Sequence, residues 1–386
     1  MTQNADVLSK VIALEGDLAT HLFERETAIE AAMLALLTGE HLLLLGPPGT
    51  GKSLLVRSLC ERIDGATFFE HLLTRFSVPE ELFGPLSLSA LEKDTYRRIA
   101  AGTLVEAHIA FLDEVFKANS AILNSLLGLV NERIYFEAGQ SHAAQLLSLF
   151  AASNETPEDD SLCALHDRFL LRVTVPYLAE DDSLRRLFGV VPNAPKSTIT
   201  LAELRLAQCQ VERVPLGKDA MEAIIAIKHE LEQEGVAASD RRWRACAGLV
   251  KARAWLEGDS ESSADHCEIL THALWSEFSH IRVVERVVAK IANPLNLEAV
   301  ELEDAAKDLY DQRPGIDHPN LTDALEPLLR QLSDIQSRLA QRIGSSPPKR
   351  TTRARQALTK IETWHRALSQ LALRSLSQLH MAPGAA

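Results

Sequence analysis

The first half of the chain alternates between helical and strand-like hydrophobic patterns. Apolar positions recur at helical spacing over residues 5–37, which predicts two helices ahead of the first strand. Short apolar runs separated by helix-length segments then predict five strands, over residues 42–45, 66–73, 109–112, 146–152 and 170–175. The first run is apolar at every position, as expected for a strand buried on both faces of a parallel sheet. This alternation predicts an α/β fold.

After Pro176 the pattern becomes helical. Three helices are expected first, over residues 221–234, 241–257 and 264–278. From Ile281 onward helical patterning continues to the last residues. We therefore expect an α/β domain, a connecting segment for which packing with the C-terminal helices is one option, a small helical domain and a C-terminal helical domain. In that order the parts cover residues 1–180, 181–212, 213–280 and 281–386.

Composition narrows the class of protein. Acidic residues outnumber basic ones by 53 to 40, and the resulting charge of −13 disfavours sequence-independent binding to nucleic acid, so no stable nucleic-acid partner is expected. The five cysteines are scattered, which predicts buried thiols in a reducing cytosol rather than disulfides or a zinc site. No apolar run reaches the roughly 18 residues of a transmembrane segment. We expect a cytoplasmic protein that meets a membrane only through its partners.

The segment directly after the first predicted strand carries the pattern G-x-x-x-x-G-K-[ST]. It reads Gly46, Pro47, Pro48, Gly49, Thr50, Gly51, Lys52 and Ser53. Glycines allow main-chain N–H groups to turn inward around phosphates, and the helix N-terminus that follows adds positive potential. Lys52 would reach the β- and γ-phosphates, and the Ser53 hydroxyl would bind magnesium. With Leu54 as a further contact, the loop predicts binding of ATP and Mg²⁺; a Gly/Pro-rich turn without a ligand is the alternative.

Polar residues also end two of the later strands. Asp113 and Glu114 follow the apolar run 109–112, where charges need a partner such as magnesium on a triphosphate. Asp113 would hold the ion, and Glu114 would orient and deprotonate the attacking water. Asn154 ends the next strand and could contact the γ-phosphate or that water. An exposed acidic pair and ordinary turn chemistry are the respective alternatives.

Together these motifs resemble an AAA+ ATPase, with Walker A at 46–53, Walker B at 109–114, Asn154 as sensor 1 and the segment 165–169. Within that superfamily the chain resembles the MoxR family through residues 23–25, 73–87 and 111–118. The nearest likeness is to its RavA-type regulatory ATPases, which work with a von Willebrand A domain partner. The similarity spans about residues 5–280. It implies an αβα nucleotide-binding domain followed by an all-helical lid.

The resemblance also implies a homo-hexameric ring with nucleotide between subunits. On this basis Arg168 is the finger that reaches the neighbour's γ-phosphate, with Arg172 as the nearby alternative. Residues 239–242 resemble the sensor 2 motif, with Asp240 in place of proline. This implies that Arg241 contacts the γ-phosphate of its own chain, with Arg242 as the alternative.

Two insertions of the family's clade can be placed as hairpins, at residues 84–106 and 133–145. They would contact a client or serve only a structural role. The RavA type carries a β-rich insertion that binds a decarboxylase, but residues 281–386 are helical in pattern throughout, so that partner is not expected. The basic segment 349–355 is interpreted as a solvated helix start.

The expected function is ATP hydrolysis to ADP and phosphate by a ring that remodels a protein client together with a von Willebrand A domain protein. Two alternatives remain. A nucleic-acid-associated ring motor is disfavoured by the net charge. A nucleotide-switched binding module with little turnover is disfavoured because candidates for every catalytic role are present.

Overall fold

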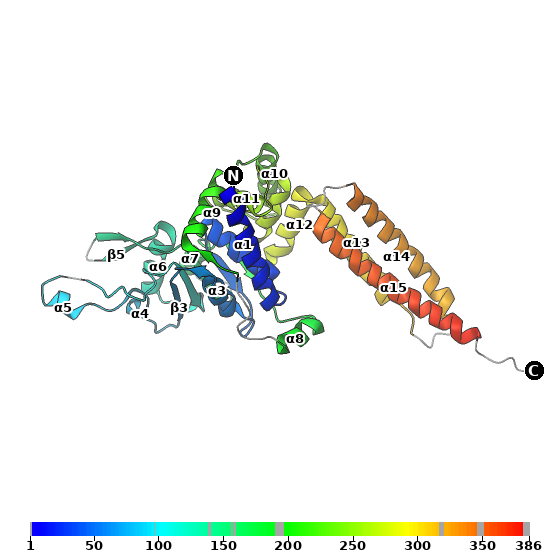
Figure 1. The fold of residues 1–386 in the computed structure, drawn as a ribbon, viewed down its shortest axis with the longest axis horizontal. Helices are drawn as coiled ribbons and strands as arrows, with labels where there is room; N and C mark the ends of the chain where they lie inside the picture. Colours follow the sequence, from blue (N-terminus) through cyan, green and yellow to red (C-terminus); the bar gives the residue numbers. More distant parts are fainter. Residues whose placement is uncertain are drawn as a thin grey trace, which may run out of the picture. The chain divides into compact units, whose positions relative to one another are not determined.

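The computed structural model describes residues 2–95, 97–137, 140–155, 157, 160–189, 197–315, 320–345 and 351–380. It divides into two compact units (Figure 1). The first comprises Met1–Ile224 with Leu231–Val284, and the second comprises Ile225–Glu230 with Glu285–Ala386.

A five-stranded parallel sheet forms the centre of the first unit, in the order β3-β4-β7-β1-β8. The strands are β1 (Leu42–Leu45), β3 (Phe68–Leu72), β4 (Ile109–Asp113), β7 (Ser148–Ser153) and β8 (Leu171–Thr174). All five correspond to predicted strands, so the α/β prediction is confirmed. Every residue of β1 and β7 is buried, because helices cover both faces of the sheet. Of these helices, α2 (Glu26–Thr38) and α3 (Lys52–Cys60) contact the sheet, and α6 (Ser120–Glu132) follows β4 in the chain.

The part of the first unit that follows the sheet is mostly helical. It contains α8 (Asp181–Phe188), α9 (Leu201–Arg213), α10 (Lys218–Gln233), α11 (Asp240–Leu256) and the 3-10 helices η2 (Ala264–His272) and η3 (Phe278–His280). The third expected helix is therefore a 3-10 helix. Two strands that the sequence analysis missed, β2 (Ile63–Asp64) and β9 (Ile199–Thr200), pair with each other. Two residues are too few to show an alternating pattern.

The segment before the lid helices packs inside the first unit. α9 contacts α2, α11 and α1 (Thr2–His21). Packing of this segment with the C-terminal helices was one option that the sequence left open. Glu203 completes the capping box of α9 with Thr200, and it accepts a 2.6 Å hydrogen bond from Lys10 of α1. These bonds lower the pKa of Glu203 to about 2, with the Lys10 bond as the largest cause. The N-terminal helix and α9 are thus joined by a charged contact.

Both predicted insertions project from the same side of the first unit (Figure 1, left). The second is a hairpin of β5 (Ile134–Glu137) and β6 (Gln140–Ala143), as expected. Among the described residues, the first has a single antiparallel bridge between Leu86 and Arg98 instead of paired strands. Its tip forms the short helix α5 (Leu88–Leu91), because the Ser87 hydroxyl caps it by accepting the Ala90 N–H. The first insertion therefore differs from the expected hairpin.

The second unit is helical, as its sequence pattern predicts. α12 (Ile281–Ala292) leads into three long helices, α13 (Pro294–Asp311), α14 (Leu321–Gly344) and α15 (Thr352–His380). Their common core contains Ala299, Leu325, Leu332, Leu339, Ile361 and Leu368. Glu298 of α13 binds Arg338 and Arg342 of α14, at 2.8 and 2.9 Å. Lys349 and Arg350 of the basic segment lie outside the described residues.

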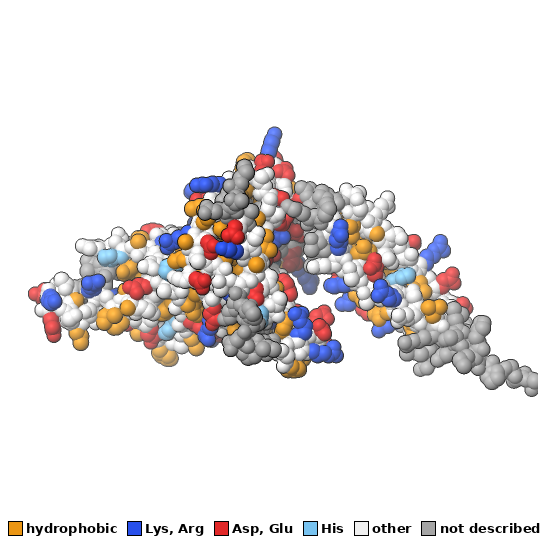
Figure 2. Space-filling view, in the orientation of Figure 1, with side chains coloured by type: hydrophobic (Ala, Val, Ile, Leu, Met, Phe, Trp, Pro, Cys, Tyr) orange, Lys and Arg blue, Asp and Glu red, His pale blue; other side chains and the backbone are white. Residues whose placement is uncertain are grey.

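The surface carries both signs of charge. Figure 2 shows acidic and basic side chains interspersed over both units on the face drawn. Among the described residues, no helix combines the length and the hydrophobicity that crossing a membrane requires.

Candidate functional site

Residues 46–53, the glycine-rich loop, join the carboxyl end of β1 to α3. Gly46, Gly49 and Gly51 have φ angles of 152°, 79° and 84°, which residues other than glycine rarely adopt. A Cβ atom at Gly46 would lie 2.3 Å from the carbonyl oxygen of Val175. Because the first N–H groups of a helix have no partner within it, the start of α3 adds free donors to the loop. The loop therefore has the features of an anion cradle.

Lys52 folds back over this loop. Its ammonium donates to the carbonyl oxygens of Gly46 and Pro47, at 2.7 and 2.8 Å. Burial lowers the pKa of Lys52, while the nearby carboxylates of Asp113 and Glu114 oppose that shift. Lys52 is thus held at the mouth of the loop, where phosphate oxygens could replace the two carbonyls.

Ser53 and Leu54 lie in the first turn of α3. Leu54 is 54% exposed, so its contribution to a ligand would be its main-chain N–H. The Ser53 hydroxyl and the Asp113 carboxylate offer oxygen atoms as metal ligands, the ligand type that magnesium prefers. The residues present therefore fit a magnesium ion bound together with phosphates.

Glu114 follows Asp113 in a left-handed conformation, with φ 53° and ψ 45°. Such a conformation is costly for a residue with a side chain and is concentrated at functional sites. The Glu114 carboxylate accepts a 3.1 Å hydrogen bond from the Asn154 amide and lies 3.3 Å from the Lys117 ammonium. Two residues that are 40 positions apart in sequence thus meet at the carboxyl edge of the sheet.

A mainly apolar cleft of about 460 Å³ adjoins the glycine-rich loop. Its lining includes Pro47 and Pro48 of the loop, Val175 and Pro176 after β8, and Phe278 of η3. This volume is in the usual range for small-molecule sites. The cleft could hold a flat apolar group next to a phosphate chain.

A second polar cluster surrounds Asp167. The Arg241 guanidinium donates to the Asp167 carboxylate at 2.8 Å and to the Asn131 amide oxygen at 2.9 Å. Burial alone would raise the pKa of Asp167, but the guanidiniums of Arg242 and Arg241 lower it below its ordinary value. Together with Arg168, these residues line a cleft of about 360 Å³. The Arg168 Nε atom is buried and has no partner among the described residues.

The two alternative arginines are enclosed in the protein. Arg172 is 1% exposed and donates to the main-chain carbonyls of Trp275 and His166. Arg242 is 3% exposed, and its guanidinium binds Asp167 and several carbonyl groups. Either side chain would have to leave the core to reach another molecule, which favours Arg168 and Arg241 for the two predicted roles.

Arg241 and the glycine-rich loop lie at opposite ends of the strands of the sheet. Asp167 precedes β8 and Asn131 is near the C-terminal end of α6, so the cluster sits where the strands begin. The loop starts where β1 ends, and at about 3.3 Å per residue the four residues of β1 alone separate the two edges by about 13 Å. Arg241 therefore lies away from the glycine-rich loop of its own chain in this structure, and its predicted contact with the γ-phosphate of its own chain stays a prediction.

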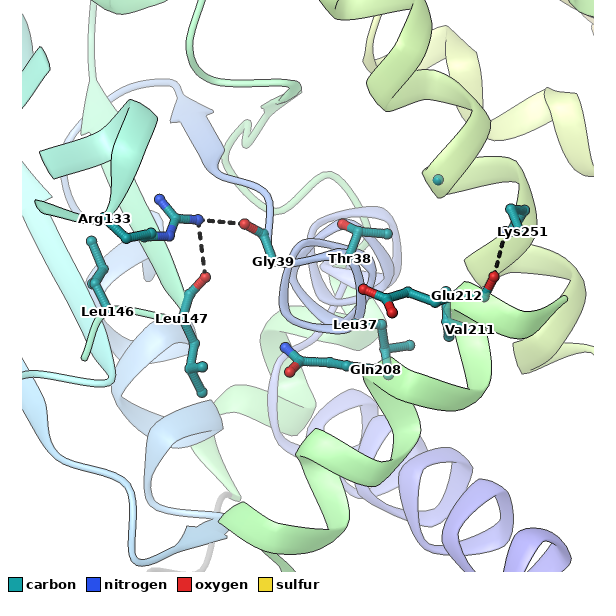
Figure 3. A pocket seen from close by; sticks show the side chains of 11 residues that line it. Leu37, Thr38, Gly39, Arg133, Leu146, Leu147, Gln208, Val211, Glu212 and Lys251 are labelled. Carbon is teal, nitrogen blue, oxygen red and sulfur yellow. Dashed lines mark hydrogen bonds between the residues drawn. The ribbon is translucent and has the colours of Figure 1, made fainter. Parts of the chain in front are cut away.

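Sequence reasoning missed the role of Arg133. This residue caps α6 in a left-handed conformation, with φ 56°, and its guanidinium donates to the carbonyls of Gly39 and Leu147 (Figure 3). In the same view Lys251 donates to the Glu212 carbonyl at the end of α9. The cations around this cleft of about 350 Å³ thus bind the carbonyls of Gly39 and Glu212 at helix ends and that of Leu147 just before β7. Only the tertiary contacts reveal this arrangement.

Glu257, Asp259 and His266 could be mistaken for a metal site, since their ligand atoms lie within 4.8 Å of one another. The Ser263 N–H donates to His266 Nδ1 at 2.8 Å, so the hydrogen of the neutral ring is on Nε2. Nε2 then donates to Asp259 at 3.2 Å and has no lone pair for a metal. This group is a hydrogen-bonded cluster.

Comparison with protein families agrees with these features. Residues 9–212 match the model of the MoxR domain in the MoxR-vWA-beta-propeller ternary systems, and residues 219–288 match an AAA lid domain. One uncharacterised protein of Methanocaldococcus jannaschii is 37% identical over 315 residues, which cover 81% of this chain and 82% of that protein. The chaperone MoxR1 of Mycobacterium tuberculosis is 24% identical over 186 residues, covering 47% of this chain and 48% of its own.

A solved structure shares the fold. It is that of a candidate ATPase from Cytophaga hutchinsonii, with a TM-score of 0.62, 16% identity, and coverage of 75% of this chain and 96% of that one. The glycine-rich loop, the acidic strand end and the lid thus occur in a chain that matches the MoxR domain over more than half its length. The protein belongs to the MoxR family of AAA+ ATPases.

Proposed function

We propose that this protein binds ATP with Mg²⁺ at the glycine-rich loop and hydrolyses it to ADP and phosphate. The observation that carries the proposal is the meeting of Lys52, Asp113, Glu114 and Asn154 at one edge of the sheet. An ammonium, two carboxylates and an amide beside a cradle of N–H groups match the needs of phosphoryl transfer to water. The apolar cleft beside Pro48 would take the adenine base.

Each residue has a distinct role in this proposal. The N–H groups of residues 49–54 and the Lys52 ammonium bind the phosphate oxygens, in place of the carbonyls that Lys52 now contacts. Ser53 and Asp113 would hold Mg²⁺, which supplies positive charge against the phosphates. Glu114 accepts the proton of the attacking water, and Asn154, now bonded to Glu114, orients that water.

A complete site would need two subunits. Arg168 and Arg241 lie at the edge of the sheet away from the loop of their own chain, and they share the Asp167 cluster. We propose that both act on the nucleotide of a neighbouring subunit, where their charge stabilises the transition state. Together with the family resemblance, this favours a homo-hexameric ring.

The partners are proposed from the family. The matched model describes MoxR domains of systems that also contain a vWA component, which supports a von Willebrand A domain partner. A chaperone-like action on a protein client follows from the resemblance, and the two projecting insertions are the proposed contacts with that client. We further propose a cytoplasmic location and retain the RavA-type likeness as a sequence-based hypothesis.

A nucleotide-switched binding module is the second candidate. In this structure the Asn154 amide and the Lys117 ammonium each contact one carboxylate oxygen of Glu114, so both compete with an attacking water for that carboxylate. A site that stayed in this arrangement with ATP bound would switch without turnover. Phosphate release by the assembled protein distinguishes the two candidates.

Lys52→Ala should weaken ATP binding by about ten- to hundredfold, because it removes charge-assisted hydrogen bonds worth roughly 1.5–3 kcal/mol. The measurement is ATP affinity by calorimetry. Arg57→Ala is the matched control, since Arg57 lies on the same helix but is 55% exposed and bound to Glu70. Unchanged affinity in Lys52→Ala would show that the loop is not the nucleotide site.

Glu114→Gln should retain ATP binding and reduce turnover by on the order of a hundredfold or more, the scale expected for loss of a general base. Phosphate release under saturating ATP measures the effect. Lys117→Ala is an informative companion, since it removes the other contact of Glu114 without removing the carboxylate. Turnover at the wild-type rate in Glu114→Gln would mean that another residue activates the water.

Arg168→Ala and Arg241→Ala subunits should each bind ATP nearly normally but hydrolyse it poorly, because their charge acts on a neighbour's transition state. Mixing either one with Lys52→Ala subunits should recover some hydrolysis, at junctions where an intact loop meets intact arginines. The assay is phosphate release, with mixed assemblies verified by mass. Mixed assemblies without recovered activity would exclude action between subunits.

A further inference from the structure

A buried arginine outside the Walker and sensor motifs contacts the glycine-rich loop. Arg25 directly precedes α2 and is 8% exposed. Its Nε atom donates to the Thr50 carbonyl at 3.1 Å, and its Nη2 atom donates to the Pro176 carbonyl at 2.8 Å. Its third bond, from Nη1, goes to the carbonyl of Glu24 at 2.7 Å. One guanidinium thus joins the loop to the segment that follows β8.

The bond to Thr50 has a consequence for the loop. In a trans peptide the carbonyl of one residue and the N–H of the next point in opposite directions. Because the Thr50 carbonyl accepts the hydrogen bond of the buried Arg25, the N–H of Gly51 points away from Arg25. Gly51 has φ 84°, and Lys52 follows it. A contact with Arg25 therefore fixes the direction of a donor in the cradle.

The segment after β8, which Arg25 joins to the loop, is also held in place. The Glu24 carboxylate accepts the main-chain N–H groups of Ala179 and Glu180, at 2.7 and 3.0 Å. These bonds fix the segment that contains Pro176, the second acceptor of Arg25. Glu24 has a left-handed φ of 55°, and its side chain and that of Arg25 bind neighbouring points on this segment. The fork of Arg25 therefore spans two anchored carbonyls.

We propose that Arg25 is a positioning residue for nucleotide binding, which holds the Thr50 peptide so that the Gly51 N–H faces the phosphates. The inference rests on the proposed function and adds a residue to its machinery. A planar guanidinium donates to both carbonyls at fixed angles, whereas a lysine ammonium supplies the charge without that geometry. Arg25→Lys therefore separates orientation from charge.

The test compares full-length wild type, Arg25→Lys and Arg25→Gln in binding of Mg-ADP and Mg-ATP by calorimetry, and in steady-state ATP hydrolysis. Arg25→Gln should lose about ten- to hundredfold in affinity for both nucleotides, the effect of losing charge-assisted bonds. Arg25→Lys should lose affinity in the same direction. KM should rise in both variants while kcat changes by a much smaller factor, because neither variant removes a group that touches the reacting atoms.

A matched control separates positioning from stability. Arg62 is also buried, at 3% exposure, and its guanidinium binds the Asp17 carboxylate of α1 at 2.7 Å. This ion pair lies away from the glycine-rich loop. Arg62→Gln should reduce thermal stability but retain nucleotide affinity. If Arg25→Gln does not fold, Arg25→Lys is compared with Arg62→Gln under conditions where both variants have lost the same amount of stability.

The outcomes are distinct. Wild-type protein that binds neither nucleotide would contradict both the proposed function and the role of Arg25. Wild-type binding with unchanged affinity in Arg25→Gln, or full affinity in Arg25→Lys, would overturn the positioning role alone. An equal affinity loss in Arg62→Gln would also overturn it, since the effect would then reflect general destabilisation.

Discussion

The turn at the carboxyl end of β1 is the constraint on which the rest of the site depends. Here a strand with no exposed residue passes into a helix through a loop whose N–H groups would turn inward around phosphates. The backbone can do so only because glycines occupy the positions with positive φ, and because Gly46 leaves room for the Val175 carbonyl. Other parts of the site, including Asp113, Glu114 and Asn154, come from strands in register with β1 or its neighbours.

The parallel sheet also separates the charged groups into two sets. Lys52 and the carboxylates of Asp113 and Glu114 lie near the carboxyl ends of the strands. Arg168 and Arg241 lie around Asp167, near the ends where the strands begin. A buried sheet cannot bring the two ends of its strands together, so under the proposed function these arginines act on the nucleotide of another subunit. The position of the lid helix α11 therefore provides a structural argument for assembly that the motifs alone do not provide.

Much of the fold could be predicted from the sequence, because buried strands and amphipathic helices have periodic patterns. The five strands and the glycine-rich loop with its flanking elements are examples, whereas β9 is too short to have a pattern. The long-range contacts of arginines were beyond sequence reasoning. Arg241 lies in a motif that implied contact with its own nucleotide, yet it binds Asn131, 110 positions away. Arg25 likewise meets Thr50 and Pro176 only in the folded chain.

The central claim is that the chain hydrolyses ATP at sites completed by a second subunit. Phosphate release per chain, measured over a dilution series in which assembly is followed by sedimentation, tests this claim most directly. The account predicts that activity per chain rises with protein concentration in step with the assembled fraction. Equal activity per chain in fully dissociated and fully assembled protein would contradict it.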